Sequence, residues 1–548
     1  MTELVHEATR DRAHRRGDAT AVAMGNDCLS YAELELRSNR FAQGLLEVGC
    51  RRGDRVCLFV PKSPLAVTAM LGSLKAGCVY VPIDLASPAA RLAKIVAAAD
   101  PSAVAVTSSA AALLDEVNGV LGGLGPAKFI ALDAGGGDDH RLDVSLAAGD
   151  LAALPNEPPR VHVSPDDAAH ILFTSGSTGT PKGVVISHRN ILTFLDWAID
   201  YFGIEESDRL SGHAPFHFDL STFDVYGALT TGSELHLVPP ELGLLPRDLA
   251  ALIDREQLTQ WFSVPSVLSY MASFDAVPHG GFPSLRRVVW CGDVLPTPVL
   301  IHWMERIAHV RYTNLYGPTE TTIASSYYTV TAPPEDETTP VPIGEACAGE
   351  ELLVLDDDLR PVAPEATGDL YIGGSGLSSG YWRDDAKTAA AFIDDPRSPQ
   401  AGRRLYRTGD RARIDSAGLV YFLGRQDSQI KNRGHRIELG EVEAAANAIG
   451  SVREAAVVGV ASGDFEGTTI CCAFAPEEPS GTNSAAVRTA MRKVLPPYMV
   501  PTRWLVLPAL PTNANGKIDR RRLRELFREA HVPKVVQEGR AVPRGESG

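Results

Sequence analysis

The sequence predicts an α/β protein with a large N-terminal domain, made of two doubly wound α/β subdomains and a small β-barrel, and a smaller C-terminal α+β domain. Three observations lead to this fold class. The chain has 548 residues, too many for a single hydrophobic core. Apolar runs alternate with helical patterns from residue 55 to residue 316, as expected for parallel sheets. Beyond residue 340, short β-rich runs are separated by glycine and proline turns.

The first α/β subdomain is expected at residues 55–132. Apolar runs and amphipathic stretches predict strands at 55–60, 79–83, 103–107 and 129–132, and helices at 65–76 and 91–99. A second subdomain is expected to begin with the glycine-rich segment 172–184, which follows a strand at 168–173, and to continue with strands at 234–238, 260–264, 286–291 and 311–316. Two such units leave a crevice at the carboxyl ends of their strands, where ligands bind in this architecture.

The remaining elements are shorter. Strands at 352–355, 369–372 and 419–422 predict the small barrel. The C-terminal domain is expected to have helices at 439–448 and 485–495 and strands at 455–460, 469–474 and 504–507. We therefore divide the chain into domains at 1–426 and 427–548, which fits the usual range of domain sizes.

Charge and composition disfavour several classes of partner. The formal net charge of −16 disfavours nucleic acid and anionic membranes. The N-terminus lacks a secretory pattern, and no apolar run reaches the roughly 20 residues that span a bilayer. The eight cysteines have no Cys-x-x-Cys spacing, so we expect reduced thiols and a cytoplasmic location.

The most informative segment is the glycine-rich and hydroxyl-rich run at 172–184. It follows a buried strand and precedes an amphipathic helical pattern, so we expect a loop between a strand and a helix. Its glycines, hydroxyls and one lysine offer the short donors and positive charge that a polyphosphate requires. These candidate ligands are Thr174, Ser175, Gly176, Ser177, Thr178, Gly179, Thr180 and Lys182. The segment is not a Walker loop, because Pro181 precedes the lysine and Gly183 follows it.

This loop resembles the phosphate loop of the adenylate-forming superfamily. Nine segments resemble, in the correct order, the motif set of nonribosomal peptide synthetase adenylation domains. They lie at 29–34, 74–84, 172–184, 218–221, 314–320, 368–374, 406–410, 424–443 and 513–520. The sequence is also similar to D-alanine–carrier and prolyl–carrier ligases. The resemblance implies an ATP-dependent, AMP-forming ligase that makes an aminoacyl adenylate and then a thioester.

The resemblance assigns ATP and Mg²⁺ as cofactors. It puts Thr319 on the α-phosphate and Glu320 on Mg²⁺, whose preference for hard oxygen ligands suits a carboxylate. The flat ring of Tyr316 suits adenine, and the Asn314 amide suits its amino edge. The Asp410 carboxylate suits two ribose hydroxyls. The resemblance adds Gly317, Arg425 and Lys517 to the nucleotide site, and the catalytic candidates are Lys517, Thr319, Glu320 and Lys182.

The resemblance also implies that the C-terminal domain is mobile. Lys517 lies in a tight Asn-Gly-Lys turn and would drive adenylation. Rotation about a hinge at Asp427 would replace the Lys517 face by the face that carries Gly434, which would open a tunnel for a phosphopantetheine thiol.

The expected substrate is a small neutral amino acid. The resemblance implies that Asp219, after Phe218, pairs with the substrate ammonium, as the matching Asp does in amino-acid-activating members of the family. The residues that match the side-chain pocket are uncharged, which disfavours a charged substrate side chain. The substrate-binding candidates are Phe218, Asp219, Leu220, Phe223, Ser263, Val289, Cys291, Gly292, Leu315, Ile323 and Ala324. Bulky members make the pocket shallow, which favours alanine, glycine or serine, with L-proline or a β-amino acid as alternatives.

Two other classes of protein were considered. An acyl-CoA synthetase-type ligase would not need Asp219, and the segment 431–438 has the amino-acid-activating form. A relative that binds a nucleotide without catalysis would be expected to have lost Lys182, Glu320, Asp410 or Lys517, and all four are present. The 31 residues after Lys517 contain no carrier-protein serine motif, so we expect the acceptor to be a separate phosphopantetheinylated carrier protein of secondary-metabolite biosynthesis.

Overall fold

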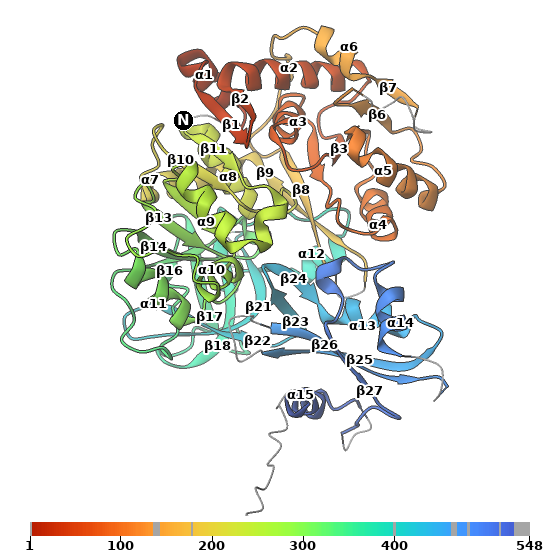
Figure 1. Cartoon of the computed structure of the whole chain (residues 1–548), viewed down its shortest axis with the longest axis vertical. Coiled ribbons are helices and arrows are strands. Elements are labelled where there is room, and N and C mark those ends of the chain that lie inside the picture. Colours follow the sequence, from red (N-terminus) through yellow and green to blue (C-terminus); the bar gives the residue numbers. More distant parts are fainter. Residues whose placement is uncertain are drawn as a thin grey trace, which may run out of the picture.

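The computed structural model describes residues 3–134, 143–176, 179–397, 402–461, 468–478, 483–513 and 517–530. The predicted fold class is confirmed: a large N-terminal α/β body lies above a smaller C-terminal module in the view of Figure 1. In the described ranges, no helix combines the length and the apolar character needed to cross a membrane.

The first sheet has eight strands in the order β19-β9-β8-β4-β3-β5-β6-β7. Its strands β3 (Arg55–Phe59), β4 (Val79–Pro82), β5 (Ala103–Val106) and β6 (Lys128–Ala131) are parallel, and β7 (Val144–Leu146) extends them. The associated helices are α3 (Pro64–Lys75), α4 (Ala89–Ala99), α5 (Ser108–Leu121) and α6 (Ala148–Ala153). Helix α3 begins where predicted because Ser63 accepts a hydrogen bond from Ala66 N and a proline occupies the first helical position.

The position of the phosphate-loop strand corrects one prediction. Strand β8 (Ala168–Thr174) pairs with β4, so it belongs to the first sheet and does not begin the second. The loop that follows leads into an antiparallel strand, β9 (Lys182–Ser187), and not directly into a helix. The β-branched run at 184–186 favours this strand. Ser187 then caps the predicted amphipathic helix α7 (His188–Phe202).

The second sheet has nine strands in the order β16-β15-β14-β13-β12-β10-β11-β1-β2. Strands β12 (Gln260–Ser263), β13 (Arg287–Trp290) and β14 (Arg311–Tyr316) run parallel in register. The other strands are β1 (Thr20–Met24), β2 (Asp27–Ser30), β10 (Arg209–Gly212), β11 (Glu234–Leu237), β15 (Ser326–Val330) and β16 (Glu345–Ala346). The helices are α1 (Glu7–Arg16), α2 (Tyr31–Glu47), α8 (Leu220–Thr231), α9 (Pro246–Arg255), α10 (Pro265–Ser273), α11 (Thr297–Arg306) and the 3₁₀ turns η1 (Pro240–Leu244) and η2 (Thr319–Thr321).

The predicted small barrel is a five-stranded antiparallel sheet. Its strands are β17 (Glu350–Leu355), β18 (Thr367–Gly374), β20 (Phe392–Asp394), β21 (Arg404–Ile414) and β22 (Val420–Arg425). Strands β20 and β22 pair with different halves of the long strand β21. The nearby strand β19 (Gly380–Tyr381) instead extends the first sheet, and α12 (Asp385–Ala391) follows it.

The C-terminal module begins with a hairpin of β23 (Gln429–Asn432) and β24 (His435–Glu438). Its turn contains Arg433 and Gly434, both with positive φ. The predicted α+β elements follow: α13 (Leu439–Asn447), β25 (Val452–Ala461), β26 (Thr468–Pro476), α14 (Ser484–Met491), η3 (Pro497–Met499), β27 (Arg503–Val506) and α15 (Arg520–Glu529). The domain boundary and the hinge at Asp427 stay predictions, although the chain passes from one sheet to the next at this point.

Candidate active site

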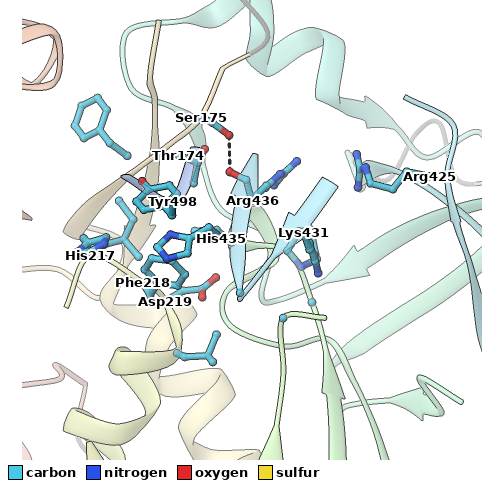
Figure 2. A pocket seen from close by; sticks show the side chains of 18 of the residues that line it. Thr174, Ser175, His217, Phe218, Asp219, Arg425, Lys431, His435, Arg436 and Tyr498 are labelled. Carbon is cyan, nitrogen blue, oxygen red and sulfur yellow. Dashed lines mark hydrogen bonds between the residues drawn. The ribbon is translucent and has the colours of Figure 1, made fainter. Parts of the chain in front are cut away.

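One cavity lies between the N-terminal body and the C-terminal hairpin (Figure 2). The N-terminal body contributes the end of β8, the segment before α8, and the turn that follows β14. The C-terminal module contributes residues of the β23–β24 hairpin and Tyr498. The lining residues include Thr174, Ser175, Phe218, Asp219, Leu220, Gly292, Gly317, Thr319, Asp410, Arg425, Lys431, Gly434, His435, Arg436 and Tyr498.

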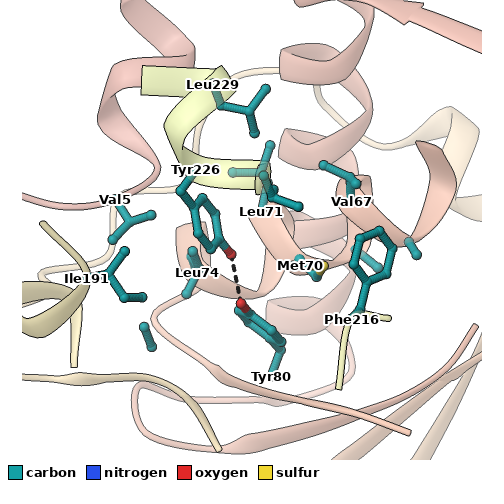
Figure 3. Close-up of a cluster of buried hydrophobic side chains, with 14 of the residues drawn as sticks. Val5, Val67, Met70, Leu71, Leu74, Tyr80, Ile191, Phe216, Tyr226 and Leu229 are labelled. Carbon is teal, nitrogen blue, oxygen red and sulfur yellow. Dashed lines mark hydrogen bonds between the residues drawn. The ribbon is translucent and has the colours of Figure 1, made fainter. Parts of the chain in front are cut away.

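A buried cluster fixes the elements around this cavity (Figure 3). The Tyr226 hydroxyl on α8 donates to the Tyr80 hydroxyl on β4 at 3.0 Å. The Tyr80 hydroxyl also lies 3.1 Å from His170 Nδ1 on β8. Leu71 and Leu74 of α3 pack in the same cluster. Strand β8 leads to the phosphate loop and α8 begins directly after Asp219, so the cluster holds these two parts of the site in a fixed relation.

One end of the cavity contains a chain of hydrogen bonds between side chains. The Tyr316 hydroxyl donates to Asp410 Oδ2 at 2.5 Å. Arg425 pairs with the other oxygen of Asp410 and, at 2.7 Å, with Asp427. Burial raises the pKa of Tyr316, and the neighbouring Asp410 carboxylate raises it further. The Asn314 amide, which was predicted to contact adenine, donates to the Pro342 carbonyl at 2.8 Å and lies outside the cavity lining.

Beside the cavity lies the Glu320 carboxylate, which has no exposed surface. Its Oε1 lies 3.2 Å from Lys182 Nζ and accepts a hydrogen bond from the Tyr381 hydroxyl at 2.7 Å. Its Oε2 accepts a hydrogen bond from Arg436 at 2.6 Å. Burial alone would raise the pKa of Glu320, but the Arg436 and Lys182 charges outweigh this effect and lower it. Burial also lowers the pKa of Lys182, with a further contribution from Arg436.

In the phosphate loop, Gly176 lies close to Gly179 and Thr180. A Cβ atom at Gly176 would lie 2.1 Å from the Thr180 carbonyl oxygen, so only glycine fits there. Gly179 has a φ of +75° and donates its N–H to the Gly176 carbonyl. The Ser175 hydroxyl donates to the Arg436 carbonyl at 2.7 Å (Figure 2). The predicted ligands Ser177 and Thr178 lie outside the described residues.

Asp219, which was predicted to pair with the ammonium group of the amino acid, lines the cavity. Burial raises the pKa of Asp219, while the Thr319 hydroxyl and the Lys431 charge oppose the rise. Phe218, Leu220 and Gly292 line the cavity beside it. The other substrate candidates are buried and do not line the cavity: Phe223, Ser263, Val289, Cys291, Leu315, Ile323 and Ala324. Their predicted contact with substrate stays a prediction.

Backbone strain occurs directly after the 3₁₀ turn η2. Thr322 and Ile323 have φ values of +61° and +70°, which are unfavourable for β-branched residues. Cys291 Sγ lies 3.9 Å from the Ile323 carbonyl oxygen, and burial raises the pKa of this thiol to about 12. The cysteine is therefore a neutral, space-filling group. Strain of this kind is concentrated at functional sites, where the surrounding structure enforces it.

The C-terminal module brings the Gly434 face, and not Lys517, to the cavity in the part of the chain that the structure describes. A Cβ atom at Gly434 would lie 2.4 Å from Val264 Cγ1, so a larger residue would not fit. Lys517 is exposed, and its N–H donates to Asn513 Oδ1 at 3.1 Å. The geometry therefore corresponds to the arrangement that was predicted to admit a thiol.

Several residues at the site were not predicted from the sequence. His435 stacks on Tyr498 with ring centroids 3.6 Å apart, and it meets the Phe218 ring edge-on at 4.8 Å. Burial lowers the pKa of His435 to about 3, so the ring is neutral. Tyr381 and Arg436 contact Glu320. The segment 424–443 was identified as a motif, and roles were assigned to its Arg425, Asp427 and Gly434, but not to His435 or Arg436. The contacts of Tyr381, His435 and Arg436 join residues that lie far apart in the sequence, so only the structure could reveal them.

Two protein-family models match this chain. A family model described as AMP-binding enzyme matches residues 9–382, and a model described as AMP-binding enzyme C-terminal domain matches residues 441–517. An L-proline–[L-prolyl-carrier protein] ligase of Pseudomonas fluorescens is 36% identical, covering 94% of this chain and 98% of the relative. A ligase of the same description from Streptomyces coelicolor is also 36% identical, covering 92% and 93%.

A solved structure agrees with these matches. An artificially fused adenylation–PCP di-domain, NpsA-ThdA from Klebsiella oxytoca, superposes with a TM-score of 0.77 at 25% identity, covering 91% of this chain and 93% of that one.

Proposed function

Because the chain belongs to the AMP-binding enzyme family, we propose that it activates an amino acid with ATP and transfers it to the phosphopantetheine thiol of a separate carrier protein. In the first step a substrate carboxylate oxygen attacks the α-phosphorus of ATP, and the bond to pyrophosphate breaks. In the second step the thiol sulfur attacks the acyl carbon, and AMP leaves. The observation that carries this proposal is the convergence of Asp219, Asp410 and Thr319 on one cavity, with the Glu320 cluster beside it.

The nucleotide roles follow from the chemistry of these groups. Asp410 would accept the ribose hydroxyls, and Tyr316, hydrogen-bonded to it, would provide a ring surface for adenine. Thr319 would contact the α-phosphate, and Lys182 with the phosphate loop would neutralise the charge that develops on pyrophosphate. Lys517 would act in adenylation after the C-terminal module has rotated about Asp427.

A magnesium ion is implied by the family, and the residues fit it. Glu320 is a buried carboxylate beside the phosphate loop, and a hard oxygen donor of this kind is what Mg²⁺ prefers. Both of its oxygens are engaged here by protein groups, so the fit requires that one of these groups move away. When bound, the ion would neutralise phosphate charge.

The substrate that we propose is a small uncharged amino acid. Asp219 would pair with its ammonium group in a largely dry site, where opposite charges attract strongly. Leu220, Phe223 and Leu315 are bulky and buried, and they would leave little depth for a side chain, which favours alanine, glycine or serine.

L-Proline is the second candidate, because both curated relatives named above are L-proline ligases and this chain covers nearly their whole length. A β-amino acid is a further alternative, since the same carboxylate would pair with an ammonium group one carbon farther away.

Mass spectrometry of the acceptor tests the thioester step. We expect a phosphopantetheinylated peptidyl carrier protein to gain the mass of one aminoacyl group when enzyme, ATP, Mg²⁺ and the amino acid are present. Coenzyme A is the control acceptor, because it carries the same phosphopantetheine thiol arm as the carrier but lacks the protein. Loading of coenzyme A at a rate equal to or above that of the carrier would favour an acyl-CoA synthetase-type ligase instead.

A further inference from the structure

His217 lies in the segment between β10 and α8, two residues before Asp219, and it lines the cavity (Figure 2). We propose that His217 is the general base of the thioester step and accepts the proton of the phosphopantetheine thiol. This inference rests on the proposed two-step reaction and adds a catalytic residue to the second step.

The first argument is that the imidazole of His217 forms no hydrogen bond within the part of the chain that the structure describes. Its Nε2 atom is buried and has no partner. Buried polar atoms of side chains are nearly always hydrogen-bonded, because an unpartnered one costs free energy. A neutral imidazole carries one N–H and one nitrogen with a free lone pair. The ring is therefore available to a ligand in the cavity.

The second argument is a row of four aromatic rings that line the cavity. His217 meets Phe218 edge-on with ring centroids 5.1 Å apart, and Phe218 meets His435 edge-on at 4.8 Å. His435 then stacks on Tyr498. The first two rings belong to the N-terminal body and the last two to the C-terminal module. Gly434, on the face that was predicted to open the thiol tunnel, directly precedes His435. A thiol that enters on this face would therefore arrive beside the row that contains His217.

The nucleotide end of the cavity lies elsewhere. Asp410, which is proposed to accept the ribose hydroxyls, pairs with Arg425, and both line the cavity. Figure 2 draws Arg425 and His217 on opposite sides of the view. In an α-aminoacyl adenylate, the acyl carbon is bonded to the carbon that bears the ammonium group. It would therefore lie close to the segment that carries both Asp219 and His217.

The third argument is the protonation state of the ring. Burial lowers the pKa of His217, and the Asp84 carboxylate opposes this effect only in part. The ring is therefore neutral near pH 7 and can accept a proton, and the nearby carboxylate would favour the imidazolium that forms. The other ionisable side chains at this end of the cavity are Arg91 on α4 and His435 and Tyr498 of the C-terminal module.

A base at this position supplies what the thiol lacks. The thiolate, and not the thiol, is the nucleophile, and a thiol with a pKa of about 8.5 is only a few per cent ionised at pH 7. The unprotonated nitrogen of His217 accepts the proton as the S–H bond breaks, and the sulfur bonds to the acyl carbon. The bond from that carbon to the AMP oxygen then breaks, and AMP leaves with the electron pair. The imidazolium finally gives its proton to water.

Single-turnover transfer from a preformed enzyme–adenylate complex to the phosphopantetheinylated carrier protein tests this assignment. The amino acid is the one that gives the strongest ATP–pyrophosphate exchange. His217→Gln keeps a polar side chain that does not take up a proton. We expect it to slow transfer at pH 7 by about 100-fold or more, which is the usual contribution of a general base, and to leave pyrophosphate exchange near the wild-type rate. His213→Gln is the matched control, because His213 lies in the same segment, packs on Trp261 and does not line the cavity.

Hydroxylamine separates loss of the base from loss of the adenylate. It attacks the acyl carbon as a neutral amine, so no base has to remove a proton first. We expect the enzyme–adenylate complexes of the wild type and His217→Gln to form hydroxamate at equal rates. A loss of hydroxamate formation as large as the loss of transfer would overturn the proposal, because His217 would then only hold the adenylate or the fold. If His217→Gln does not fold, His217→Asn carries the same comparison.

The pH profile of transfer is a readout that a purely structural role would not change. Between about pH 6.5 and about pH 8.5 the wild-type rate should change little, because the neutral base is present throughout. The His217→Gln rate should rise about tenfold per pH unit, as the thiolate fraction does, so its deficit should shrink. A deficit that is equal at every pH, or no deficit, would overturn the role of His217. If the wild type forms neither hydroxamate nor thioester, the proposed function itself fails, which is a distinct result.

Discussion

The Arg91 guanidinium on α4 forms an ion pair with the Glu441 carboxylate on α13, and both residues are buried where the N-terminal body meets the C-terminal module. The two residues are 350 positions apart in sequence. Tyr498, which lines the cavity, is close enough for both charges to affect its pKa, which burial raises. The pair therefore belongs to the arrangement that brings Gly434 to the site, and rotation of the module would break it.

Exchanging the two charges tests whether this pair stabilises the thiol-accepting arrangement. Loss of one partner of a buried ion pair costs about 3–5 kcal/mol. Arg91→Glu and Glu441→Arg should each slow thioester formation while leaving ATP–pyrophosphate exchange near the wild-type rate. The double variant should recover much of the loss. Single-turnover loading of the carrier protein measures the rate of thioester formation. If the double variant is as slow as each single variant, the ion pair does not stabilise this arrangement.

Lys517→Ala should slow adenylation without destabilising the folded protein. The side chain is exposed here, so we expect the melting temperature to be unchanged. Adenylation should fall by about 100-fold or more, since a positive charge at the developing phosphate charge is lost. Transfer from a preformed adenylate should be nearly normal. A variant that exchanges pyrophosphate at the wild-type rate would remove the assignment of Lys517.

Asp410→Asn should weaken ATP binding. Asp410 accepts from Tyr316 and pairs with Arg425, and it would also accept the ribose hydroxyls. Loss of charge-assisted hydrogen bonds should raise the KM for ATP by about tenfold or more. Tyr316→Phe is the matched control, because it removes the hydroxyl that donates to Asp410 and keeps the ring. An unchanged KM for ATP in Asp410→Asn would contradict the ribose role.

The Glu350 carboxyl predicts a pH dependence of stability. Burial raises its pKa from 4.5 to about 7, although the Gly376 N–H donates to Oε1 at 2.6 Å. The folded state therefore binds a proton more tightly than the unfolded state, and stability should fall as pH rises from about 4.5 to about 7.

Glu350→Gln removes this titration. The difference in melting temperature, Glu350→Gln minus wild type, should increase as pH rises from about 4.5 to about 7 and should stay constant at higher pH. Thermal unfolding of both proteins at a series of pH values measures the difference. A difference that does not depend on pH would contradict the raised pKa.

The local pattern of apolar residues predicted most of the helices and strands, but it could not predict which strands pair with each other. The strand at 311–316 and the helix that contains Leu195 were found because their apolar periodicity is strong. The sheet that β8 joins depends on its pairing with β4, which lies far away in sequence. The same limit applies to the site. Arg436 lies in a motif that gave this residue no role, Tyr381 lies in no motif, and Asn314 donates to a carbonyl that no motif identifies.

ATP–pyrophosphate exchange across the proteinogenic amino acids, with D-alanine, β-alanine and 3-aminobutyrate added, tests the central claim most directly. We predict strong exchange with one small uncharged amino acid, lost in Asp219→Ala. Exchange with L-proline or a β-amino acid would keep the mechanism and overturn the pocket argument. No exchange with any amino acid, from a folded protein that binds ATP, would contradict amino-acid activation.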